Sequence, residues 1–154
     1  MKSDLIELAK EIATKTHKGQ KRWDGSDYIN HPARIAQLLK DQGASDIEIA
    51  AAWLHDVIED TGMLNYELAN KINDTRVSYL VDLLTHYEDQ SYVEYILRMK
   101  QEIKTGVDYF KLAAKIKSLD ILDNLRSNPE KISKTRRDKY ELAYYILTGE
   151  VLRH

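Results

Sequence analysis

Residues 49–62 read IAAAWLHDVIEDTG, and this stretch decides the fold. Its first six residues are apolar, and the polar pair His55-Asp56 follows them directly. A helix that is apolar on all sides normally lies at the centre of a helical bundle. We therefore expect a central helix that opens at residue 45 or 46, runs to about Ile58 and is followed by a stop at Thr61-Gly62.

The rest of the chain also has a helical pattern. Apolar residues recur at helical spacing, and only two prolines and six glycines interrupt them. Asn30 is expected to cap the second helix, with Pro32 in its first turn. Further helices are predicted over residues 4–17, 30–43, 64–71, 76–84, 91–104, 109–125 and 129–147. The sequence thus predicts an all-α bundle, and 154 residues suit a single domain.

The composition restricts the environment and the partners. The absence of cysteine excludes disulfides and thiolate metal sites, and it suits a reducing cytoplasm. A formal net charge of −2 offers no general surface for nucleic acid. The longest apolar run has six residues and the first residues do not resemble a signal peptide. We expect a soluble cytoplasmic protein with no membrane or nucleic-acid partner.

One cluster of basic residues departs from this overall balance. Lys15, Lys18, Lys21 and Arg22 fall within eight residues, with His17 among them. Such a cluster is either a solvated helix end or, beside a site for an anionic substrate, a group that attracts it.

Four residues have side chains that could bind a metal ion in an otherwise apolar pattern: His31, His55, Asp56 and Asp120. Taken singly, each has an ordinary explanation as a cap, a surface residue or a hydrogen-bond acceptor. Together they supply two imidazoles and two carboxylates, a donor set that suits Mn, Fe or Zn better than Ca. We expect them to hold one divalent cation.

A second acidic pair, Glu59-Asp60, follows His55-Asp56 by one helical turn. On a helix, Glu59 shares a face with His55, and Asp60 shares one with Asp56. A general base for a metal-bound water would be wanted at this position, one turn from two expected ligands. The ordinary explanation is a pair of acidic residues at a helix end, although negative charge there opposes the helix dipole.

The motifs carry a resemblance to a known family. They are HKGQKR at 17–22, YINHP at 28–32, AAWLHDVIEDT at 51–61 and KSLD at 117–120, followed by Asn124 and Arg126. In this order they resemble the (p)ppGpp hydrolase domain of Rel/SpoT-type enzymes. The chain looks most like the stand-alone small alarmone hydrolases, and the resemblance extends from about residue 5 to residue 147.

The resemblance implies an HD-domain helical bundle that binds one divalent metal, usually Mn²⁺. It implies metal ligation by His31, His55, Asp56 and Asp120, with Glu59 and Asp60 as the catalytic pair that positions or deprotonates water. It also implies substrate contacts from Arg22, Asn124 and Tyr140, to which we add Lys18 and Lys21 because they would attract a polyphosphate. The reaction implied is hydrolysis of the 3′-pyrophosphate of ppGpp or pppGpp to give GDP or GTP and pyrophosphate, the chemistry of the stringent response.

Three positions depart from the family pattern. Trp23 stands where a second basic residue is usual, Asp27 replaces a Pro, and Ile121 replaces an Arg. The alternatives are therefore an HD phosphohydrolase for another nucleotide, such as a deoxynucleoside monophosphate or a nicotinamide dinucleotide phosphate, or a non-catalytic nucleotide-binding module. Tyr140, Tyr144 and Tyr145 could line the interface of a homo-oligomer, although core packing explains such rings equally well.

Overall fold

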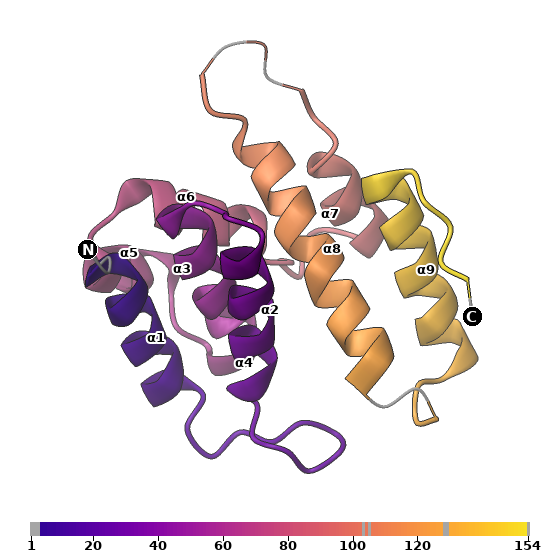
Figure 1. Cartoon of the computed structure of the whole chain (residues 1–154), viewed down its shortest axis with the longest axis horizontal. Coiled ribbons are helices and arrows are strands. Elements are labelled where there is room, and N and C mark those ends of the chain that lie inside the picture. The colour runs from indigo at the N-terminus through magenta and orange to yellow at the C-terminus, as the bar shows by residue number, and fades with distance from the viewer. Residues whose placement is uncertain (1–3, 103, 105, 128–129, 154) are drawn as a thin grey trace. The chain divides into compact units, whose positions relative to one another are not determined.

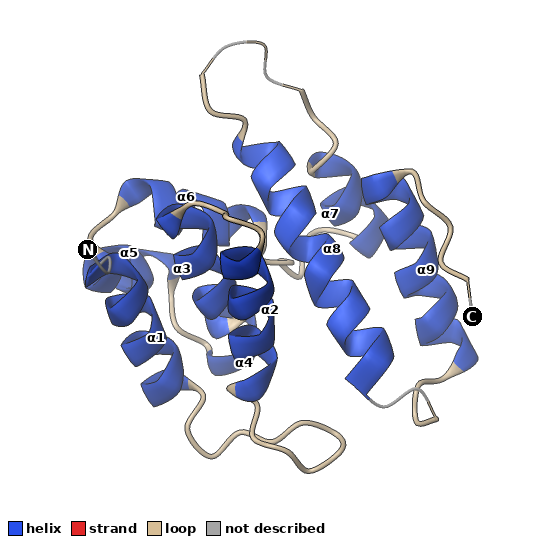
Figure 2. Cartoon of the chain, in the orientation of Figure 1, coloured by secondary structure: helices blue, strands red, loops and turns tan. Residues whose placement is uncertain are grey.

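The computed structural model describes residues 4–102, 104, 106–127 and 130–153. Across these residues it is helical and contains no strand, which confirms the all-α fold class (Figure 2). An isolated antiparallel bridge joins Lys21 and Asp27 within the loop after the first helix. The helices are α1 (Asp4–Thr16), α2 (Asn30–Asp41), α3 (Asp46–Leu54), α4 (Val57–Thr61), α5 (Asn65–Ile72), α6 (Thr75–Leu83), α7 (Tyr92–Arg98), α8 (Tyr109–Ser127) and α9 (Lys134–Thr148) (Figure 1).

The chain divides between Thr85 and His86 into two compact units. In the first unit, α3 packs against α1, α2 and α6, as expected for a central helix. Its three consecutive alanines, residues 50–52, are completely buried, and their small side chains let the neighbouring helices approach closely. A capping box between Ser45 and Glu48 fixes where α3 begins.

The second unit is built from α7, α8 and α9, with α9 in contact with both other helices. Its core includes Tyr95 and Ile96 from α7 together with Ile116 and Ile121 from α8, all at most 1% exposed. The apolar residues of α8 thus fill a core, as the sequence pattern predicts.

Three predicted helix boundaries differ from those in the structure. The predicted central helix breaks at His55-Asp56, so α3 and α4 are separate. Asn30 is not the N-cap of α2: the cap is Ile29, which makes no side-chain cap hydrogen bond. The helix expected to extend to residue 104 ends at Arg98.

The last helix begins at Lys134 because the hydroxyl of Ser133 accepts the backbone N–H of Arg136. The start expected at Pro129 lies outside the described residues.

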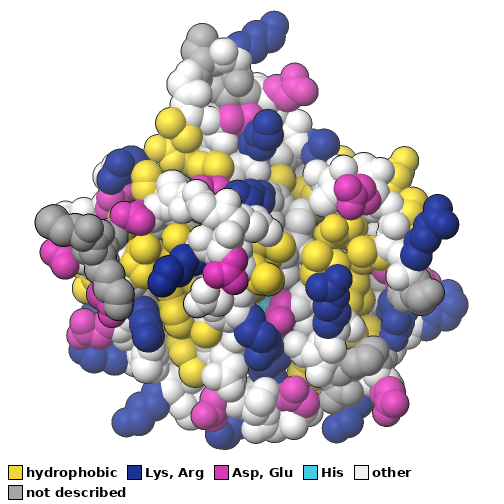
Figure 3. All heavy atoms as spheres, in the orientation of Figure 1, with side chains coloured by type: hydrophobic (Ala, Val, Ile, Leu, Met, Phe, Trp, Pro, Cys, Tyr) yellow, Lys and Arg dark blue, Asp and Glu magenta, His cyan; other side chains and the backbone are white. Residues whose placement is uncertain are grey.

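The distribution of surface charge and the lengths of the helices relate to the expectation of no nucleic-acid and no membrane partner. Basic and acidic side chains are interspersed on the face shown in Figure 3. Among the described residues, no helix combines the length and the apolar character needed to cross a bilayer.

Candidate metal centre

Three of the four predicted metal ligands converge in the first unit. The Nε2 atom of His55 lies 3.0 Å from Oδ2 of Asp56, and Nε2 of His31 lies 3.6 Å from the same oxygen. One donor atom from each of the three lies within 4.8 Å of the other two. His31 and His55 are at most 2% exposed, so both rings are shielded from solvent.

The break between α3 and α4 brings His55 and Asp56 together. Neighbouring residues of a continuous α-helix point about 100° apart, which would direct these two side chains to different sides. Here α3 ends at Leu54, and Asp56 has φ −106° and ψ 0°, outside the usual helical range. The departure from helical geometry lets adjacent residues present their donor atoms to one point.

The local backbone fixes the orientation of the His55 ring. Its Nδ1 lies 2.7 Å from the carbonyl oxygen of Ala52, and a carbonyl can only accept, so Nδ1 carries the proton. Nε2, which faces Asp56, is therefore the ring nitrogen left to bind a metal. Metal-binding histidines typically use their second nitrogen in this way.

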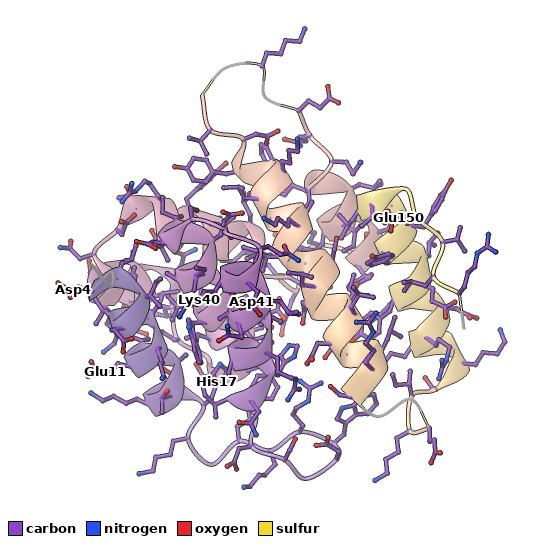
Figure 4. All side chains as sticks on the ribbon, in the orientation of Figure 1. Asp4, Glu11, His17, Lys40, Asp41 and Glu150 are labelled. Atoms are coloured by element: carbon purple, nitrogen blue, oxygen red, sulfur yellow. The ribbon has the colours of Figure 1, made fainter. Side chains whose placement is uncertain are left out.

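Tyr28 supports the site from the loop before α2. Its hydroxyl donates a hydrogen bond to Oδ2 of Asp56. Its ring lies between those of His17 and His31, with centroid distances of 4.9 and 5.7 Å. His17, labelled in Figure 4, follows the last turn of α1 and is buried. The sequence analysis assigned no role to Tyr28, although its spacing of three residues before His31 could have indicated one.

The acidic pair Glu59 and Asp60 lies on the short helix α4, directly after the metal ligands. The backbone N–H of Asp60 donates to the carbonyl oxygen of Asp56 at 2.9 Å, so the predicted one-turn relationship between these two residues holds. Both acidic residues are exposed and therefore accessible to water and substrate.

A hydrogen-bonded chain positions the Asp60 carboxylate. The amide nitrogen of Gln20 donates to Asp60 at 3.1 Å, and the Gln20 carbonyl lies 2.8 Å from Nδ1 of His17. Desolvation by nearby atoms and the charge of Asp56 raise the pKa of Asp60, whereas the hydrogen bonds from Gln20 and Tyr28 oppose the rise. The raised pKa brings this carboxyl closer to the basicity that a proton acceptor needs.

The predicted basic residues differ in their surroundings. Arg22 is only 7% exposed and its guanidinium lies 5.8 Å from the centre of the Tyr28 ring. Lys18 is exposed. Lys21 forms an ion pair with Asp27. Asp27 is one of the three departures from the family pattern, and it places a carboxylate beside a predicted substrate-binding cation.

Asp120 and the other predicted residues of α8 and α9 belong to the second unit. Asp120 is 2% exposed and accepts hydrogen bonds from Lys117 at 2.7 Å and from Asn124 at 3.2 Å. Desolvation is the largest single influence on the pKa of Lys117 and lowers it, but the charges of Asp120, Tyr95 and Tyr92 and the hydrogen bond to Asp120 together raise this pKa well above its usual value. Tyr140 is partly buried on α9. Ile121 is completely buried.

The donor set in the first unit fits a divalent transition metal. Two ligand atoms that each lie about 2.1 Å from an ion, at roughly a right angle, are about 3 Å apart. The 3.0 and 3.6 Å separations to Asp56 are of this size. Two imidazole nitrogens with a carboxylate oxygen suit Mn, Fe or Zn, in agreement with the sequence prediction.

A groove elsewhere in the first unit is not this site. A groove of about 460 Å³ lies among α1, α2 and α3 and is lined in part by Lys10, Lys40 and Trp53. None of the predicted metal, catalytic or substrate-binding residues lines it. The candidate site is therefore defined by its converging donor atoms and not by cavity size.

The helical bundle and the histidine–aspartate centre define an HD-domain protein, and the chain belongs to the HD-domain family, whose model matches residues 9–142. Relatives of named activity extend the comparison. The chain is 31% identical over 136 residues to a probable guanosine-3′,5′-bis(diphosphate) 3′-pyrophosphohydrolase of Synechocystis, which covers 82% of this chain and 17% of the relative. It is 30% identical over 151 residues to a probable GTP pyrophosphokinase of Mycobacterium leprae, which covers 90% of this chain and 18% of that protein.

The chain thus spans less than a fifth of the length of these two relatives.

One solved structure is similar to nearly the whole of this chain. It is described as a metazoan ortholog of SpoT that hydrolyzes ppGpp and plays a role in starvation responses. The two structures have a TM-score of 0.74 and 26% sequence identity, and the match covers 98% of this chain and 89% of that one.

Proposed function

We propose that this protein hydrolyses the 3′-pyrophosphate of the guanosine alarmones ppGpp and pppGpp, releasing pyrophosphate and leaving GDP or GTP. The convergence of His31, His55 and Asp56, with the pair Glu59-Asp60 immediately after them, carries the proposal. Similarity to a ppGpp-hydrolysing protein over 98% of the chain supports it.

In this proposal His31, His55, Asp56 and Asp120 hold one divalent cation, most simply Mn²⁺. Asp120 is suited to the role because its carboxylate is buried and its orientation is fixed by hydrogen bonds from Lys117 and Asn124. The family match at residues 9–142 includes residues from both compact units. We accordingly propose that residues 1–154 act as a single HD-type domain.

The catalytic roles follow from the surroundings of each side chain. A divalent cation in this site would neutralise phosphoryl oxygens and acidify water. Asp60, held by Gln20, and the exposed Glu59 accept the proton of the attacking water. Arg22, Lys18, Lys21, Asn124 and Tyr140 bind the nucleotide, with Arg22 contributing a largely buried and therefore strongly interacting charge.

The biological setting follows from the same proposal. Alarmone hydrolysis places the protein in the cytoplasm and in the stringent response. A homo-oligomer could form through α9, because Tyr145 is 50% exposed and could lie at an interface. Tyr144 is buried in the core and could not.

One incubation tests the proposed reaction. Purified protein is mixed with ppGpp and Mn²⁺, and the products are separated by ion-exchange chromatography beside the Asp56→Ala variant. GDP and pyrophosphate in equal amounts, absent with the variant, are expected. Release of single phosphates, or turnover of a deoxynucleoside monophosphate or a nicotinamide dinucleotide phosphate in place of ppGpp, would refute the assignment.

A further inference from the structure

Lys139 on α9 has an unusual environment in the second unit. Its Nζ atom lies 4.4 Å from the centre of the Tyr92 ring and 5.3 Å from that of Tyr140. Cation–π contacts of this kind favour an ammonium but do not neutralise it. Among the described residues, no carboxylate pairs with Lys139, whereas Lys134 on the same helix is 2.8 Å from Asp138.

The charges around Lys139 are also positive. Desolvation first, and then the charges of Arg136 and Lys117, lower the pKa of Lys139. The carboxylate of Asp120 pairs with Lys117, and no ion pair joins it to Lys139. A partly desolvated cation beside other cations is destabilised until an anion joins it, and a phosphate group is the multiply charged anion that the proposed substrate would provide.

The order of contacts within the unit indicates which phosphate Lys139 would meet. Lys117 contacts Asp120 and lies 5.4 Å from the Tyr95 ring centre. The Tyr95 and Tyr92 rings are 6.0 Å apart, and Lys139 stands over Tyr92. A series of side-chain contacts thus joins Lys139 to Asp120 within the second unit, and Lys139 does not contact Asp120 itself. The proposed function makes Asp120 a metal ligand, so the attacked phosphorus would lie at Asp120 and Lys139 would meet a different phosphate.

We infer that Lys139 binds a phosphate group of the substrate other than the one that is attacked, and so contributes to substrate specificity. The inference rests on the proposed alarmone hydrolysis. The bound group is either the 5′-diphosphate or the terminal phosphate of the 3′-diphosphate, and both present the same chemistry to an ammonium. Lys139 is exposed and therefore accessible to such a ligand.

Steady-state kinetics with ppGpp tests the inference. Lys139→Met keeps the length of the side chain and removes its charge, and Lys134→Met is the matched control on the same helix. We expect Lys139→Met to raise KM about tenfold, as for the loss of one charged contact, with kcat within twofold of the parent. Lys139→Arg should restore most of the affinity and Lys134→Met should leave both constants unchanged. An unchanged KM in Lys139→Met, or an equal increase in Lys134→Met, would overturn the inference.

A second substrate separates the two sources of phosphate. With a guanosine 3′-diphosphate that lacks 5′-phosphates, the effect of Lys139→Met disappears if the 5′-diphosphate is the bound group. The effect persists if Lys139 binds the terminal 3′-phosphate. Either result supports a phosphate-binding role for Lys139.

A binding measurement keeps the inference testable even if the protein does not hydrolyse ppGpp. Inorganic pyrophosphate is titrated into the isotope-labelled protein, and the amide signals of Tyr92 and Tyr140 are followed by NMR. Saturable shifts in the parent that are lost in Lys139→Met support an anion site at this position. Absence of shifts in the parent would refute it.

Discussion

The Nδ1 atom of His55 is held by the carbonyl oxygen of Ala52 at 2.7 Å, and this contact leaves Nε2 directed at Asp56. Backbone geometry within α3 therefore fixes which nitrogen of this ring is turned toward the candidate metal site.

The first prediction concerns metal binding by the first unit. Mn²⁺ that saturates the parent protein at about 100 times its Kd should stabilise the fold by about 2.7 kcal/mol. Asp56→Ala should abolish this gain because it removes the oxygen shared by the two histidines. Thermal unfolding with and without Mn²⁺ measures it, with Asp41→Ala at the exposed end of α2 as the control. A full metal-dependent rise in Tm for Asp56→Ala would contradict the assignment.

The second prediction separates catalysis from metal binding. Glu59→Gln and Asp60→Asn should bind Mn²⁺ as the parent does, because neither side chain is a proposed ligand. Loss of a general base should lower kcat for ppGpp by about 10²- to 10⁴-fold in at least one of them. Glu11→Gln, an exposed change on α1, provides the control. Parent-like kcat values in both variants would eliminate the pair as the catalytic base.

The third prediction concerns Tyr28. Tyr28→Phe keeps the ring between His17 and His31 and removes the hydroxyl that donates to Asp56. Loss of a group that orients a ligand typically weakens metal binding about 10- to 100-fold. Titration with Mn²⁺, followed by calorimetry, gives the Kd. If Tyr28→Phe binds Mn²⁺ as tightly as the parent, the hydroxyl has no orienting role.

The fourth prediction tests whether Asp120 completes the metal site. Asp120→Asn keeps the shape of the side chain but removes its charge, and it should weaken Mn²⁺ binding at least tenfold. Asp123→Asn, on the same helix, should not. Equal affinities for the parent and Asp120→Asn, measured by the same titration, would restrict the site to His31, His55 and Asp56.

The fifth prediction concerns the departure at position 121. Ile121 is completely buried, so Ile121→Arg would place an unpaired charge in the core and should destabilise the protein by about 3 kcal/mol or more. Ile121→Val should cost only about 0.5–1.5 kcal/mol. Urea denaturation gives both values. A stable Ile121→Arg variant with a lower KM for ppGpp would show that the position faces substrate.

The sequence predicted most helices of the first unit because their apolar periodicity is a local signal, although it assigned the cap of α2 to the wrong residue. The burial of the alanines in α3 and the stop at Gly62 follow directly from that pattern. The break at His55-Asp56 was missed because neither residue is a helix breaker. It results from the packing of this particular site, which overrides a modest helical preference.

The candidate site was predicted in part for a similar reason. Residue types with obvious metal chemistry, such as His31 and His55, can be identified in a sequence. The supporting residues Tyr28 and Gln20 act through hydrogen bonds across the fold, and their residue types are common at unrelated positions. The ion pair of Lys21 with Asp27 depends on a loop bridge that spacing alone does not predict.

The interruption between α3 and α4 has a consequence for protein design. A His-Asp pair transplanted onto an ideal, uninterrupted helical scaffold would keep the residue types of the motif but lose its geometry. A transferable unit must include the non-helical step at Asp56 and the Ala52 carbonyl that anchors the neighbouring ring.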